Sequence, residues 1–148
     1  MENMKIVIVS GYFNPLHGGH LDMIEAAAAM GEKLIVVVNS DVQQVLKKGK
    51  IILSEQNRAR VMSSLRDVDE VILSVDTDLG QRKTLEMIAK KYPDDILIFA
   101  NDGDKDSEQV IPEGDVCRQY NIEMAFNISG KGKVDSSTRI NQASGHDQ

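Results

Sequence analysis

The chain has 148 residues, of which 41% are hydrophobic and 27% charged, and it carries a net charge of −6 at pH 7. A chain of this length buries roughly 68–70% of its unfolded surface on folding, so we expect one domain over 1–148, with 141–148 as a frayed tail. The acidic charge, the 4% aromatic content and the absence of Trp argue against a nucleic-acid-binding surface.

Strands and helices are predicted to alternate along the sequence. Runs of β-branched residues predict strands, and Ala-rich or amphipathic stretches bounded by capping residues, Gly or Pro predict helices. In chain order we expect a strand at 4–10, a helix at 20–30, a strand at 34–38, a polar stretch through 50, a helix at 54–66, a strand at 71–75, a helix at 79–92, a strand at 96–100, a short helix near Pro112, a strand at 122–126 and a last helix capped by Ser136.

This alternation, without repeats or linkers, predicts an α/β fold. We expect a single Rossmann-like domain with a doubly wound, five-stranded parallel sheet. Ligands of such sheets bind beyond the carboxyl ends of the strands. Functional residues are therefore expected in the loops that follow these five strands.

The loop after the first strand carries the clearest chemical signal. It runs from Gly11 to His20 as G-Y-F-N-P-L-H-G-G-H and contains neither a dinucleotide-binding glycine fingerprint nor a P-loop. His17 and His20 stand three residues apart at a helix start, which places both rings on one face. Free N–H groups and the positive end of a helix favour an anion, to whose oxygens imidazoles can donate. The loop predicts a phosphate site rather than a zinc site, which favours His at i, i+4 with a third ligand.

The quoted residues resemble a known family. The pattern G-x-F-[DN]-x-x-H-x-G-H after the first strand resembles the first signature of the HxGH nucleotidyltransferase superfamily, the cytidylyltransferase-like fold. Ser136-Ser137-Thr138-Arg139 is similar to its second signature, which opens the last helix. Stretches at 39–41, 55–58, 66–71 and 94–102 look most like glycerol-3-phosphate cytidylyltransferase and the adenylyltransferase domain of ADP-heptose synthesis.

The resemblance implies a reaction. A nucleotidyl group, CMP or AMP, would pass from a nucleoside triphosphate to the phosphate of a small sugar- or polyol-phosphate-like acceptor, with release of pyrophosphate. Catalysis would consist of positioning and charge stabilisation. Mg²⁺ is the expected cofactor, carried on the triphosphate rather than in a protein metal site. Alternatives are an adenylyltransferase of the pantetheine-phosphate or nicotinate-mononucleotide type, or a noncatalytic nucleotide-binding regulator.

The same resemblance assigns the nucleotide site. His17 and His20 would stabilise the α-phosphate and its bridging oxygen as catalytic residues. The other implied nucleotide-binding residues are Gly11, Tyr12, Phe13, Asn14, Gly19, Asp102, Lys131, Ser136, Ser137, Thr138 and Arg139. Two departures from the family pattern are Asn14, where relatives often carry Asp, and Asp135, where relatives usually carry an apolar residue.

Four basic residues are candidates for the acceptor site. By resemblance, Lys47 or Lys48 would contact both substrate phosphates as a catalytic clamp, although a lysine cluster can also be a solvated turn. Arg58 and Arg66 stand eight apart on one predicted helix, hence roughly on one face. They would bind acceptor phosphate or pyrophosphate, unless they are exposed helix charges paired with neighbouring carboxylates.

The expected cellular context follows from what the sequence lacks. No apolar run approaches the ~20 residues that cross a bilayer, and the N-terminus has no signal-peptide layout. A single cysteine, Cys117, cannot form an internal disulfide. We therefore expect a cytoplasmic protein without a membrane or nucleic-acid partner. We also expect a homodimer.

Overall fold

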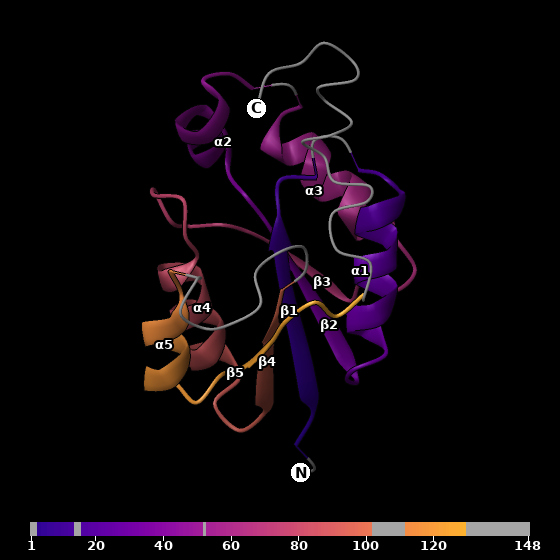
Figure 1. Cartoon of the computed structure of the whole chain (residues 1–148), viewed down its shortest axis with the longest axis vertical. Coiled ribbons are helices and arrows are strands. Elements are labelled where there is room, and N and C mark those ends of the chain that lie inside the picture. Colours follow the sequence, from indigo (N-terminus) through magenta and orange to yellow (C-terminus); the bar gives the residue numbers. More distant parts are fainter. Residues whose placement is uncertain (1–2, 14–15, 52, 102–111, 130–148) are drawn as a thin grey trace.

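The computed structural model describes residues 3–13, 16–51, 53–101 and 112–129. Five parallel strands form one sheet in the order β3–β2–β1–β4–β5 (Figure 1). They are β1 (Lys5–Gly11), β2 (Lys33–Val38), β3 (Glu70–Leu73), β4 (Ile96–Ala100) and β5 (Glu123–Ala125). The chain progresses outward from β1 to β3 and then returns to pair β4 with β1, so the order reverses between β1 and β4. Ligand sites of open α/β sheets lie at such a reversal.

Helices cover both faces of the sheet (Figure 1). They are α1 (Gly18–Ala28), α2 (Asp41–Lys48), α3 (Glu55–Ser63), α4 (Arg82–Lys91) and α5 (Gly114–Gln119). Apolar residues of α1 and α3 pack with Val7 and Val9 of β1, while those of α4 and α5 pack with Ile6 and Ile8 on the opposite face. The predicted doubly wound, five-stranded parallel sheet is confirmed.

The helices after β2 differ from the prediction in three places. The polar stretch after β2 contains the helix α2, which Ser40 caps and Gly49 ends in a left-handed conformation, with φ of 75°. The helix predicted at 54–66 starts as expected after Ser54 but ends at Ser63. The helix predicted at 79–92 begins only at Arg82, because the preceding loop folds back onto its first N–H groups.

The remaining predicted elements have these outcomes. All five predicted strands overlap the observed ones, and the last predicted helix, from Ser136, lies outside the described residues. The longest described helix, α1, has 11 residues. In this part of the chain, no helix has the length and apolar character needed to cross a membrane.

Candidate functional site

The loop after β1 turns sharply at Phe13. Phe13 has a positive φ of 53° and its side chain is 2% exposed, packed in the core under α1. A Cβ on Gly11 would lie 2.9 Å from Cζ of this ring, so the close approach requires glycine. The rings of Phe13 and His20 form a T-shaped pair with centroids 5.0 Å apart. The Phe13 side chain is therefore a core group, and only its backbone is available for the predicted nucleotide contact.

His17 and His20 begin α1 as a reciprocal pair. His17 is the N-cap residue, and its Nδ1 accepts the N–H of Gly19 at 3.0 Å. Nδ1 of His20 accepts the N–H of His17 at 3.3 Å, which completes a capping box. The two rings stack with centroids 3.8 Å apart. Since each Nδ1 accepts a hydrogen bond, the proton of each neutral imidazole is on Nε2.

The electrostatics of this pair favour a neutral donor. Burial lowers the pKa of His20 to about 3, and the neighbouring charge of His17 acts in the same direction. His20 is therefore a neutral N–H donor at pH 7. The first turn of α1 carries no acidic side chain, so the positive end of the helix dipole adds to the attraction for an anion.

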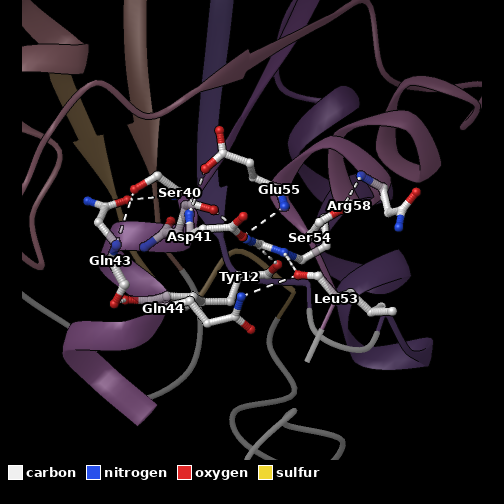
Figure 2. A network of polar contacts seen from close by, with 11 residues as sticks. Tyr12, Ser40, Asp41, Gln43, Gln44, Leu53, Ser54, Glu55 and Arg58 are labelled. Atoms are coloured by element: carbon white, nitrogen blue, oxygen red, sulfur yellow. Dashed lines mark hydrogen bonds and ion pairs between the residues drawn. The ribbon is translucent and has the colours of Figure 1, made fainter. Parts of the chain in front are cut away.

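Arg58 joins the connecting segments at the carboxyl edge of the sheet (Figure 2). Its Nη1 donates to the carbonyl oxygens of Tyr12 at 3.0 Å and Asn39 at 2.6 Å. Its Nε donates to the carbonyl of Leu53 at 2.9 Å, and Nη2 pairs with Asp41 at 2.9 Å. Arg58 is only 1% exposed, so it is not the exposed helix charge considered above. Its donors point at protein atoms, which does not favour the predicted role as a ligand of the acceptor phosphate.

Asp41 and Glu55 link the starts of α2 and α3 through reciprocal hydrogen bonds (Figure 2). The N–H of Asp41 donates to Oε1 of Glu55 at 2.8 Å, and the N–H of Glu55 donates to Oδ1 of Asp41 at 2.8 Å. Each carboxylate thereby satisfies the first N–H of the other helix. This exchange and the Arg58 bonds fix the segment that carries Lys47 and Lys48.

The structure corrects the predicted helix position of Arg66. Since α3 ends at Ser63, Arg58 and Arg66 do not share a helix face. Arg66 lies in the connection that leads to the amino end of β3, away from the carboxyl edge where His17 and His20 lie. It lines a hollow of about 260 Å³ together with Leu21, Ile24, Glu25, Leu65 and Asp67. This position gives no support to acceptor binding by Arg66.

Lys47 and Lys48 belong to the last turn of α2 and differ in their surroundings. The ammonium of Lys47 lies 4.8 Å from the centroid of the Tyr12 ring. Lys48 is half-buried, and burial together with the nearby cations of Lys47, Arg58 and Lys50 lowers its pKa. The structure thus gathers positive charge at this end of α2, next to the first loop.

A buried polar chain beneath the site was not predicted. Asn39 follows β2, and its Oδ1 accepts Nε2–H of Gln81 at 3.0 Å. Oε1 of Gln81 in turn accepts the hydroxyl of Ser74 at 2.7 Å. Gln43, fully buried, donates through Nε2 to the carbonyls of Asp78 and Gly80 at 2.8 and 2.9 Å. The spacing of Ser40 and Gln43, which form a capping box, is the sequence signal that could have revealed α2 and its buried amide.

Several predicted nucleotide-binding residues cannot be placed in the site. Asn14, Asp102, Lys131, Ser136, Ser137, Thr138 and Arg139 lie outside the described residues, as does Asp135. Over the described ranges, no group of three or more His, Cys, Asp or Glu side chains is arranged to hold a metal ion. The carboxylate of Asp41 is engaged by Arg58 and by the first N–H of α3. The placed part of the site thus consists of the two histidines, Tyr12, the α2 lysines and the Arg58 network.

Comparison with known proteins identifies the family. Residues 8–143 match the model of the family described as cytidylyltransferase-like. The chain therefore belongs to the cytidylyltransferase-like family, whose first signature the loop after β1 resembles.

Individual relatives agree with this assignment. The bifunctional protein HldE of Magnetococcus marinus is 34% identical over 127 residues, which are 84% of this chain and 24% of that protein. FAD synthase of Ferroglobus placidus is 36% identical over 95 residues, 64% of this chain and 59% of that enzyme. The crystal structure of a lipopolysaccharide core biosynthesis protein from Thermoplasma volcanium superposes with a TM-score of 0.63 at 25% identity, covering 84% of this chain and 96% of that one. The chain spans about a quarter of the HldE protein.

Proposed function

We propose that this protein transfers CMP or AMP from a nucleoside triphosphate to the phosphate of a small sugar- or polyol-phosphate acceptor. An acceptor phosphate oxygen attacks the α-phosphorus, the bond from that phosphorus to the bridging oxygen breaks, and pyrophosphate leaves. The name of the lipopolysaccharide core biosynthesis protein supports a sugar-phosphate acceptor, because that polymer contains sugars. The homodimer and the cytoplasmic location stay predictions from the sequence.

The observation that carries this proposal is the paired Nε2–H donors of His17 and His20. Backbone hydrogen bonds to Nδ1 fix the tautomer of both rings, and the low pKa of His20 keeps that ring neutral. Negative charge grows on the bridging oxygen as the bond to the α-phosphorus breaks. Fixed donors aimed at that charge stabilise the transition state more than the ground state.

The lysines and the cofactor complete the proposed site. Lys47 and Lys48 supply positive charge for the phosphates from the end of α2, next to the first loop. Mg²⁺ would enter on the triphosphate and retain several waters, since it is commonly held by substrate phosphates and few protein ligands. The described residues fit this arrangement because the Asp41 carboxylate at the start of α2 is engaged by protein donors.

Pyrophosphate release tests the proposal. The four nucleoside triphosphates should be assayed with Mg²⁺ against sugar phosphates, polyol phosphates and a flavin phosphate, the last because of the FAD synthase relatives. We expect one nucleotide and one acceptor class to support turnover. No release with any pair would refute the proposal.

Two variants separate chemistry from folding. His17→Asn retains an N-cap acceptor and His20→Gln retains the capping-box partner, but both lose the imidazole. Each should lower kcat by about 10²–10³-fold, the usual cost of removing one such donor. Lys5→Ala, an exposed lysine at the start of β1, controls for the loss of a surface charge. Activity of either histidine variant within a few-fold of the Lys5→Ala protein would contradict the proposed role.

A further inference from the structure

The side chain of Tyr12 lies between the first loop and α2, and the proposed mechanism does not use it (Figure 2). Its hydroxyl donates to the carbonyl of Gln43 at 3.4 Å, and its own carbonyl accepts from Arg58 at 3.0 Å. Burial raises the pKa of the hydroxyl, against smaller lowering effects of a hydrogen bond with Asn39 and the charge of Arg58. The ring is therefore neutral at pH 7 and attached at both its backbone and its hydroxyl.

This ring supports the ammonium of Lys47. The 4.8 Å distance from Nζ to the ring centroid is within the ~6 Å range of a cation–π contact. An aromatic face attracts an ammonium without neutralising its charge, whereas a carboxylate in that place would compete with a phosphate. Lys48, the next residue, projects about 100° away around the helix. The ring thus distinguishes two lysines that the sequence left as equal candidates.

From this geometry we infer that Tyr12 is a positioning residue, whose ring holds Lys47 in the orientation that contacts the acceptor phosphate. The inference deepens the proposed function and rests on it for the identity of the acceptor. Tyr12 acts through Lys47 and moves no proton in the reaction. Lys48 lies outside this contact, so its effect on acceptor binding is independent of Tyr12.

Acceptor kinetics with a double-mutant cycle test the inference. Tyr12→Leu removes the ring, and we expect the acceptor KM to rise roughly three- to tenfold. Tyr12→Phe keeps the ring and should bring the acceptor KM back to within about twofold of wild type. The effects of Tyr12→Leu and Lys47→Ala on the acceptor KM, expressed as free energies, should not be additive. Those of Tyr12→Leu and Lys48→Ala should be additive. Additivity with Lys47→Ala would overturn the inference.

Nuclear magnetic resonance separates this inference from the proposed function. The Tyr12 ring current should shift the Lys47 ε-methylene protons upfield, and titration with inorganic phosphate should move these resonances. Tyr12→Leu should lose the upfield shift and weaken phosphate binding several-fold, whereas Tyr12→Phe should keep both. If these results hold but no substrate pair turns over, the proposed function is wrong and the positioning of Lys47 stands. Equal phosphate affinity in wild type and Tyr12→Leu would refute the positioning role.

Discussion

His17 and His20 each accept a backbone N–H through Nδ1, so backbone groups at the start of α1 set the tautomer of both rings. This differs from sites in which an Asp orients a histidine and stabilises its protonated form. Two stacked rings at a positive helix end disfavour protonation. The pair is therefore suited to donate hydrogen bonds to developing negative charge and poorly suited to take up a proton.

The titration of His20 tests this point. Its pKa of about 3 in the folded protein lies below the ordinary value of 6.5, because burial, and secondarily His17, disfavour the charged form. The ring should keep the chemical shifts of neutral imidazole from pH 8 to about pH 4 in a nuclear magnetic resonance titration. Because the unfolded state takes up the proton first, the His20 contribution to stability is present above pH 6.5 and is lost as the pH falls toward 3. A His20 midpoint above pH 5 would contradict this assignment.

Among the secondary-structure elements, α2 departs furthest from what its sequence pattern indicates. Gln43 and Gln44 are fully buried, while Val42, Val45 and Leu46 are 46–56% exposed. Hydrophobic periodicity assumes that apolar residues face inward, so it misses a helix held by buried amides. The capping pair of Ser40 and Gln43 is a local signal that does not depend on periodicity.

Arg58 shows why the site was only partly predictable. Its four hydrogen-bonding partners come from the loops after β1 and β2, from the start of α2 and from the segment before α3, which meet only in the folded chain. Neighbouring residues in the sequence do not reveal such contacts. In contrast, the His17 and His20 pair is local, and its three-residue spacing at a helix start was enough to place both rings together.

Replacing Arg58 tests whether it holds these elements together. Arg58→Met should lower the free energy of unfolding by about 2–4 kcal/mol, since it removes the cation paired with Asp41 and the donor of three carbonyl groups. Arg60→Met, an exposed position on the same helix, is the matched control and should change stability by about 0.5 kcal/mol or less. Urea unfolding of both variants measures the difference. Equal stability of the two would show that the Arg58 contacts contribute little.

For the whole molecule, the sheet could be predicted because its central strands carry an unambiguous pattern. Residues 34–38 of β2 are at most 1% exposed, and such continuous apolar strands occur where helices cover both faces of a parallel sheet. The right-handed crossover rule then restricts the topology. The ends of the elements depend on contacts across the molecule, such as the carboxylate of Asp76 that accepts the N–H groups of Lys83 and Thr84 at the start of α4. Sequence patterns did not predict these ends.

A cluster of charged side chains at the β3 edge of the sheet links β2 and β3 to the end of α4. Glu70 at the start of β3 accepts from Tyr92 at 2.6 Å and Lys91 at 2.8 Å, both at the end of α4, and pairs with Lys33 of β2 at 3.0 Å. Burial alone would raise the pKa of Glu70, but the hydrogen bonds from Lys91, Tyr92 and Lys33 outweigh it and lower the pKa to about 2. This edge of the molecule therefore has an acid-sensitive contact.

The pH dependence of stability should report this cluster. The folded pKa of about 2 lies below the ordinary glutamate value of 4.5, so the stabilisation by ionised Glu70 is present above pH 4.5 and is lost as the pH falls toward 2. Glu70→Gln should therefore lower the free energy of unfolding by about 1–2 kcal/mol at pH 7, and the difference from wild type should shrink below pH 4.5. Glu123→Gln, an exposed position on β5, is the matched control and should follow the wild-type curve. Urea unfolding between pH 3 and 7 measures the free energy of unfolding of all three proteins. If the difference between Glu70→Gln and wild type does not change with pH, the carboxylate charge is not what joins β2, β3 and α4.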